Sequence, residues 1–374
     1  MSSDLLELFL ELCATPSPPG EERAVADIVG RYLSDLGVEW DEDDVGPQVG
    51  STTGNLYCRL PGGEDGGTPV FLCAHLDTVP PTGPLEPVVE EGVVRNAGGT
   101  ILGADNKSAV SAMLEAARAI VAENRPHAGV ELVFTPKEEV GLLGAAAFDH
   151  RRLRARVGYV FDQAAPIGEI ILGAPSANRI EARFHGRASH AGMFPEEGRS
   201  AILAAARAIA DLPLGRIDEE STANVGTIDG GSARNIVPEW CSFQAEARSR
   251  DDARLATLTQ EMLDTIAYAA STSDCTVETE VDPQYRGYRF HPDDLPVRLA
   301  AEALRRAGYA PTTAWSGGAA DANAFNVHGL ECVNLANGMA EIHTPDEHIR
   351  VDDLEGMVRV TLELVEAARG AGPA

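Results

Sequence analysis

The sequence predicts an α/β fold, in which a mixed, mostly parallel sheet is interrupted by a smaller inserted domain. Strand-length apolar runs at residues 70–74, 130–134 and 157–161 alternate with helical stretches. This alternation is typical of parallel strands that are buried on both faces. The pattern changes near Ala174, and residues 177–282 read as strand, helix, strand, strand, helix, strand. That order is the split βαβ arrangement of ferredoxin-like domains.

The individual elements follow from local patterns. Helices are expected where one helical face is apolar or where acids begin and glycine ends a segment, at residues 5–13, 21–36 and 107–122. The inserted segment has expected strands at 179–185, 224–229, 241–247 and 275–281, and helices at 200–210 and 253–269. A helix at 295–307, a strand at 332–335 and a helix at 351–368 follow. The predicted domains are residues 1–176 with 286–374, and residues 177–285.

Acidic and imidazole side chains gather at the ends of the predicted strands of the first domain. They are His75, Asp77, Asp105, Glu138, Glu139, Asp162 and His343. Ligands of parallel sheets bind beyond the carboxyl ends of the strands, so we expect these side chains to meet in one crevice. Because so many carboxylates would repel one another there, metal ions are the simplest explanation.

Residue type and spacing suggest a role for each side chain. His75 and Asp77 are two apart in an extended run, so they share a side. Since a histidine ligand usually has a carboxylate or carbonyl on its other ring nitrogen, Asp77 is predicted to orient His75. Asp105 precedes a helix and could offer one oxygen to each of two metals. Of the adjacent Glu138 and Glu139, one can bind metal while the other holds water.

Together with Asp162 and His343, this set supplies two histidines, one ligating glutamate, one terminal aspartate and one bridging aspartate. Such a set suits two zinc-like ions about 3.5–4 Å apart, and Co²⁺ or Mn²⁺ is also compatible with these ligands. Glu138 remains as the general base, which must reach the attacking water. A single His-x-Asp or Glu-Glu pair would be weak evidence, whereas the ordered set is strong evidence.

These residues and their surroundings resemble the M20 metallopeptidase family, and within it the peptidase T-like (tripeptide aminopeptidase) branch. The matching segments are residues 74–79, 103–107, 137–141, Asp162, 189–192, 230–238 and 316–323, in order over nearly the whole chain. One departure is Asn106, where the branch often has a second aspartate. That position is not a ligand, so the departure bears on the branch and not on the chemistry.

The resemblance implies a two-zinc enzyme that cleaves short peptides, with release of the N-terminal residue. It implies that one zinc is held by His75, Asp105 and Asp162, and the other by Asp105, Glu139 and His343. It also implies Glu138 as the base and Asp77 as the orienter of His75. The inserted domain would then form a homodimer and act as a lid.

Four further positions have two readings each. The resemblance implies that His190 reaches the partner subunit's site and holds the scissile carbonyl oxygen, and that Asn235 meets substrate. The alternative for each is a structural turn residue. Gly317 and Gly318 could let backbone approach the substrate, or could simply form a turn.

Two other functions remain open from the sequence. One is an M20-type amidohydrolase or carboxypeptidase that acts on N-acyl amino acids or dipeptides. The other is a non-catalytic dimeric binding protein on the same scaffold. Glu138 argues against the second, because a binding protein needs no base beside a full ligand set.

The composition of the chain bears on where in the cell the protein is expected. The six cysteines have no CxxC spacing, which favours reduced, buried thiols in a cytoplasmic protein. The N-terminus has no basic segment of a signal peptide, and no apolar stretch is long enough to span a bilayer. We therefore expect a cytoplasmic enzyme that does not bind membranes.

Charge is the second unusual property of the chain. The formal net charge is -28, and Lys107 and Lys137 are the only lysines. Such an acidic excess repels nucleic acids and anionic membranes. Acidic, lysine-poor surfaces resemble those of proteins from extreme halophiles, so we expect the fold to be stabilised by salt. An ordinary acidic cytosolic enzyme is the alternative.

Overall fold

The computed structural model describes residues 3–63 and 66–372. Its internal contacts divide the chain into two compact units. The larger unit comprises the chain up to Gly173 and from Arg289 onward, and the smaller unit spans Ala174–Tyr288. These boundaries lie three residues outside the predicted 177–285 segment at each end.

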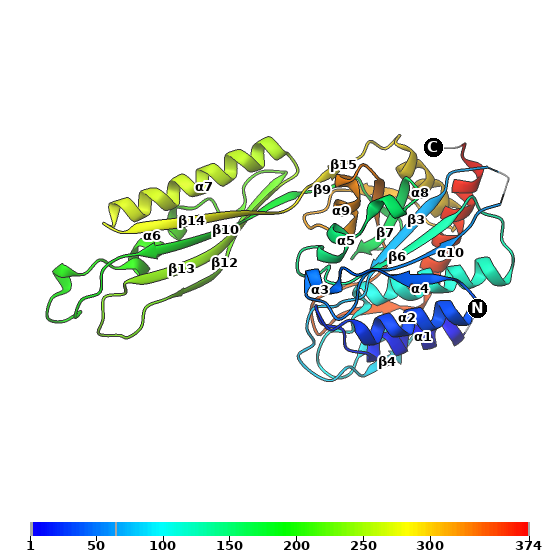
Figure 1. Ribbon diagram of the computed structural model, residues 1–374, viewed down its shortest axis with the longest axis horizontal. Coiled ribbons are helices and arrows are strands. Elements are labelled where there is room, and N and C mark those ends of the chain that lie inside the picture. The colour runs from blue at the N-terminus through cyan, green and yellow to red at the C-terminus, as the bar shows by residue number, and fades with distance from the viewer. Residues whose placement is uncertain (1–2, 64–65, 373–374) are drawn as a thin grey trace. The chain divides into compact units, whose positions relative to one another are not determined.

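The larger unit is built on an eight-stranded sheet (Figure 1). Its strands in spatial order are β1 (Trp40–Glu42), β2 (Leu56–Leu60), β6 (Val130–Thr135), β3 (Val70–His75), β7 (Val157–Gln163), β17 (Glu331–Ala336), β8 (Glu169–Ile171) and β16 (Thr312–Ala314). The four central strands β6, β3, β7 and β17 are mutually parallel. Antiparallel β2 and β8 flank them. The predicted mixed, mostly parallel sheet is confirmed.

Helices cover both faces of this sheet. They are α1 (Ser3–Ala14), α2 (Arg23–Asp35), α3 (Gly46–Val49), α4 (Ala104–Ala122), α5 (Leu143–Ala147), α8 (Leu295–Arg306), α9 (Asp321–Val327) and α10 (Val351–Gly370). On one face, Val70 and Leu72 join the large core that includes α1, α4 and α10. Alternate residues of a strand face opposite sides, so Phe71 packs on the other face, 4.8 Å from the ring of Phe325 in α9. The central strands are therefore buried from both sides.

A second, three-stranded sheet lies beside this core. It consists of β4 (Pro87–Glu90), β5 (Val93–Asn96) and β18 (His348–Arg350). Two further short strands, β9 (Gly173–Ala174) and β15 (Tyr288–Arg289), pair in the segments that connect the units. Short 3-10 helices occur at His150–Arg152 and Pro195–Glu197.

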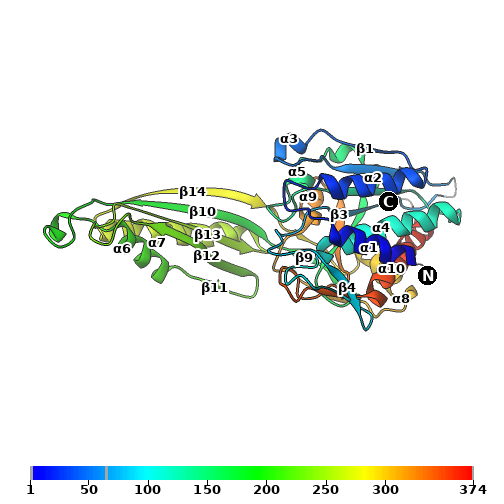
Figure 2. The same cartoon turned by 90° about the horizontal axis from the view of Figure 1, so that it is seen from below.

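The smaller unit is a two-layer domain (Figures 1 and 2). Its antiparallel sheet has the order β11 (Gly215–Arg216), β12 (Ser221–Gly230), β13 (Trp240–Ser249), β10 (Ser176–His185) and β14 (Thr276–Tyr285). Helices α6 (Ala201–Asp211) and α7 (Asp252–Thr272) cover one face, where Phe184 and Phe243 pack with Met262. Apart from the short β11, this is the predicted split βαβ arrangement, which is confirmed.

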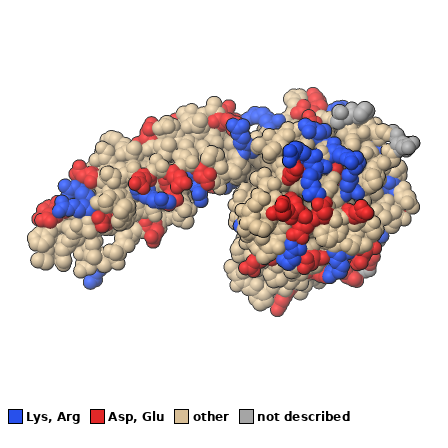
Figure 3. All heavy atoms as spheres, in the orientation of Figure 1, with Lys and Arg blue, Asp and Glu red and all other residues tan. Residues whose placement is uncertain are grey.

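Several composition-based expectations meet direct observations. All six cysteines are buried and free of disulfides. Among the described residues, no helix is long and apolar enough to cross a membrane. Figure 3 shows acidic side chains gathered across the visible face of the larger unit, beside a group of basic ones.

Candidate metal centre and active site

The predicted metal ligands and the predicted base Glu138 lie at one end of the four central parallel strands. His75 is the last residue of β3, Glu138 and Glu139 follow β6, and Asp162 lies within β7, one residue before its end. His343 is in the loop after β17. Because β6, β3, β7 and β17 are neighbours in that order, their carboxyl ends bring these side chains together.

Asp105 stands between the two histidines. Its Oδ1 lies 3.2 Å from Nε2 of His75, and its Oδ2 lies 3.2 Å from Nε2 of His343. Asp162 is 3.7 Å from Nε2 of His75, and Glu139 is 3.1 Å from Nε2 of His343. The two oxygens of one carboxylate thus face two different imidazoles, each of which has a second carboxylate beside it.

Two overlapping groups of side chains could each hold a metal ion. In His75, Asp105 and Glu139, and likewise in His75, Glu138 and Asp162, the ligand atoms all lie within 4.8 Å of one another. Nitrogen and carboxylate oxygen donors of this kind suit zinc and related divalent ions. The donor types therefore fit the ions that the sequence predicts. The two groups combine the residues differently from the predicted sets, because Glu138 belongs to one group and His343 to neither.

Asp77 holds the loop that follows β6. Its side chain is fully buried, and its two oxygens accept hydrogen bonds from the backbone N–H of Glu138 (2.9 Å) and of Glu139 (3.1 Å). Nδ1 of His75 lies 2.9 Å from the backbone oxygen of Asp77 and 3.5 Å from its carboxylate. The nearest partner of the imidazole is thus the carbonyl of Asp77, because its carboxylate is engaged by the two amides.

Burial and mutual repulsion shift the titration of these groups. Burial, together with the charge of Asp162, raises the pKa of Glu138 well above its usual value. Burial and the neighbouring Asp105 raise the pKa of Asp162 in the same way. Hydrogen bonds to Asp105 and Glu139 raise the pKa of His343 to about 10. These three side chains therefore hold protons more readily than they would in water, which is expected where carboxylates crowd around a site for cations.

Four residues without a predicted role support the centre. Buried Glu347 accepts hydrogen bonds from the backbone N–H groups of Leu102, Gly103 and Asp105. Asn334 pairs through its side-chain amide with both the N–H and the carbonyl of Asp162. The side-chain nitrogens of the two lysines bind backbone oxygens, with Lys107 on Thr15 and Lys137 on Val49. Glu347 lies only four residues after His343 in the sequence. This short separation from a predicted ligand is the one sequence feature that could have indicated a role for Glu347 at the site.

In the smaller unit, the structure brings His190 and Asn235 together. The backbone N–H of Ala191 donates to the carbonyl of Asn235 at 2.9 Å, and His190 forms a β-bridge with Ile236. Both side chains are exposed. Nδ1 of His190 accepts from the N–H groups of Gly192 and Met193, so in the neutral ring the proton is on Nε2.

The remaining predicted positions, Gly317 and Gly318, precede α9 in the larger unit. A Cβ at Gly317 would meet no atom within 4 Å, and one at Gly318 would meet only the hydroxyl of Ser316, at 3.9 Å. Neither glycine has a positive φ. The loop leads to Asp321, a buried carboxylate that bonds to Thr135 at the end of β6. The fold itself therefore does not require glycine at these two positions.

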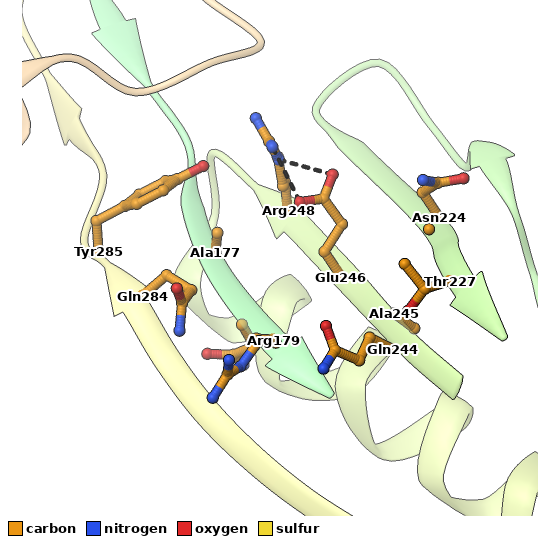
Figure 4. Close-up of a pocket in the computed structure, with 12 residues that line it drawn as sticks. Ala177, Arg179, Asn224, Thr227, Gln244, Ala245, Glu246, Arg248, Gln284 and Tyr285 are labelled. Atoms are coloured by element: carbon orange, nitrogen blue, oxygen red, sulfur yellow. Dashed lines mark hydrogen bonds and ion pairs between the residues drawn. The ribbon is translucent and has the colours of Figure 1, made fainter. Parts of the chain in front are cut away.

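A separate polar cavity of about 380 Å³ lies on the sheet of the smaller unit (Figure 4). Its arginines have acidic partners, since Arg248 pairs with Glu246 at 2.9 Å and Arg179 with Asp282 at 3.1 Å. None of the predicted site residues lines it.

Known proteins resemble the chain in sequence and fold. The sequence model of peptidase family M20/M25/M40 matches residues 71–367. The chain is 38% identical to the aminopeptidase PepT of Bacillus cereus ATCC 10987, whose crystal structure superposes with a TM-score of 0.89 over 97% of this chain and 98% of that one. A tripeptidase from Staphylococcus aureus gives 35% identity and a TM-score of 0.93 over 98% of both chains. The uncharacterized protein YqjE of Bacillus subtilis (strain 168) is 38% identical over 97% of this chain and 98% of its own length.

Proposed function

The chain belongs to peptidase family M20/M25/M40, and from this premise we propose that it is a two-metal peptidase that removes the N-terminal residue of short peptides. The observation that carries the proposal is Asp105, whose two oxygens each face a different histidine. A carboxylate so placed is suited to bridge two ions. The names of the Bacillus cereus aminopeptidase and the Staphylococcus aureus tripeptidase support the substrate class.

The metal ligands in this proposal are those of the strand-end cluster. His75, Asp105 and Asp162 would hold one ion, and Asp105, Glu139 and His343 the other. Two Zn²⁺ ions, or Co²⁺ or Mn²⁺ in their place, would polarise the peptide carbonyl and make water more acidic when bound.

Glu138 acts as the general base and then as the acid. It is partly buried beside the cluster, and burial together with the charge of Asp162 raises its pKa, so it holds a proton more readily than a glutamate in water does. Glu138 takes a proton from the attacking water and later delivers it to the nitrogen of the leaving amine. Asp77 keeps Glu138 in place through the backbone of the 138–139 turn.

Residues outside the cluster would hold the substrate. His190, with a donor proton on Nε2, is suited to bind the carbonyl oxygen that becomes negative during attack. Asn235, adjacent to His190, would bind the peptide backbone. The open space at Gly317 and Gly318 allows substrate to approach the main chain closely.

The smaller unit would form a homodimer, with His190 serving the partner's site. Exposed apolar side chains support an interface on this unit: Met193, Phe194, Leu203, Ile228, Ile236 and Trp240. Such exposure marks interaction surfaces. Within the described residues, β11 pairs with β12 only as far as Ala223, so the remaining outer edge of β12 is open to pairing. A cytoplasmic location is also part of the proposal and is supported by the six free thiols.

The test combines a substrate panel with Glu138→Gln. The wild-type enzyme should cleave a tripeptide with a free N-terminus, and it should not cleave the N-acetylated tripeptide or an N-acyl amino acid. Glu138→Gln should keep its metal content while kcat falls by at least about 10²- to 10⁴-fold. Glu341→Gln, at an exposed position near His343, is the matched control and should remain active. Preferential cleavage of N-acyl amino acids would instead identify an amidohydrolase.

A further inference from the structure

Buried Glu347 connects the two loops that carry Asp105 and His343. Its side chain is 2% exposed. One oxygen accepts from the N–H groups of Leu102 and Gly103, each at 2.8 Å, and the other accepts from the N–H of Asp105 at 3.0 Å. The carboxylate thus satisfies three donors of the turn that leads into α4.

The backbone of Glu347 belongs to the loop of His343. Its N–H donates to the carbonyl of Thr344 at 3.2 Å, which closes a turn directly after His343. One residue therefore fixes the His343 loop through its main chain and the Asp105 turn through its side chain. The two ligands that it connects face each other at 3.2 Å, from Nε2 of His343 to Oδ2 of Asp105.

We propose that Glu347 is a positioning residue that sets the distance between Asp105 and His343, and so tunes the affinity of the centre for its metal ions. This inference rests on the proposed function, because it assumes that Asp105 and His343 are ligands. Carboxylates make strong, charge-assisted hydrogen bonds to N–H groups. Without one, three donors of the turn would lose their partners, and the turn would shift to find others.

Two variants should weaken metal binding to different extents. In Glu347→Gln, the single oxygen can serve Leu102 and Gly103, while the amide NH₂ faces the N–H of Asp105. Glu347→Ala removes all three contacts. Changes around metal ligands of this kind typically cost 10–100-fold in affinity, so we expect about a 10-fold loss of Zn²⁺ affinity for the glutamine variant and about 100-fold for the alanine variant.

Glu131 provides a matched control. It is 1% exposed and likewise accepts backbone hydrogen bonds, from Arg154 at 2.9 Å and from Ala155 at 2.8 Å. It lies near the start of β6, whereas the metal ligands lie at the strand ends. Glu131→Gln should therefore lower the free energy of unfolding without changing Zn²⁺ affinity.

The experiment titrates Zn²⁺ into metal-free proteins by calorimetry, counts bound zinc by elemental analysis, and measures unfolding by urea in EDTA. Weaker Zn²⁺ binding in Glu347→Gln than in an equally destabilised Glu131→Gln supports positioning. Two zinc sites of wild-type affinity in Glu347→Gln would overturn it, whether or not Glu347→Ala folds. If the wild type itself bound fewer than two zinc ions, the proposed function would fail instead.

Discussion

Asp77→Asn offers the sharpest test of how the site is held together. The substitution keeps the size of the side chain and removes one of its two acceptor oxygens. In the native protein these oxygens receive the N–H groups of Glu138 and Glu139 at 2.9 and 3.1 Å. Asparagine can serve one of them, and its NH₂ then faces the other.

The size of the effect follows from the cost of that lost contact. Asp77 is fully buried, so water cannot replace the missing acceptor. Leaving a buried N–H unsatisfied costs about 1–3 kcal/mol, and each 1.36 kcal/mol is about tenfold in rate. If this free energy is needed to bring the 138–139 turn, and with it Glu138, back to the position that catalysis requires, kcat should fall about 5- to 160-fold. Both metals should stay bound, because the nearest partner of His75 is the backbone carbonyl of Asp77, which the substitution leaves in place.

The assay measures kcat and KM for a tripeptide, together with zinc content by elemental analysis. The control is Asp149→Asn, since Asp149 is an exposed aspartate that also accepts a backbone N–H, that of Arg151 at 3.2 Å. The control should be unaffected. A kcat within twofold of wild type for Asp77→Asn, with two zinc ions present, would refute the role of Asp77 in holding the base.

Three further predictions concern metal, salt and pH. Asp105→Ala should lose more zinc than Asp77→Ala does, because a bridge serves both ions; equal zinc counts in the two variants would contradict the bridge. The melting temperature should rise from dilute buffer to molar KCl, as the Debye length falls from about 10 Å at 0.1 M to about 3 Å; a flat or falling trend would exclude salt adaptation. Burial and the neighbouring His328 lower the pKa of His150 from 6.5 to about 4, so the folded state binds this proton less readily than the unfolded state does. Its contribution to stability is complete above pH 6.5 and is lost as pH falls toward 4, up to about 3 kcal/mol. Urea unfolding in EDTA should show a smaller loss over this range for His150→Phe, and equal losses would contradict this origin.

The fold was predictable where burial leaves a strong pattern in the sequence. Strands β3 and β6 are buried at every residue, and their mostly apolar sequences, interrupted in β6 by Glu131, are visible without a structure. The three-stranded sheet was missed because β4, β5 and β18 are short and partly exposed. Such strands depend on their neighbours more than on their own sequence.

That the proposed ligands lie close together was predictable for a related reason. Each of them is a chemically distinctive side chain near a strand end, at a helix start or, for His343, in the loop that follows β17. The parallel order of the strands brings these separate positions to one edge of the sheet. The sequence around Glu347 and Asn334 does not indicate which groups their side chains contact. Their partners are backbone groups, and those of Glu347 lie 242 to 245 residues earlier in the chain. Every residue except proline has a backbone N–H, so the residue type does not show which N–H a side chain binds. Contacts of this kind can be identified only from the structure.

The two lysines connect the charge of the chain to its architecture. Lys107 is 1% exposed and donates to the carbonyl of Thr15 at 2.6 Å, while half-buried Lys137 donates to that of Val49 at 2.9 Å. An ammonium is compact and fits where a planar guanidinium would need more room. The two lysines thus hold loops near the site, and arginine supplies the other permanently charged basic side chains. The depletion of lysine is therefore a property of the solvent-facing surface, which is where salt screens charge, and the salt dependence should arise there.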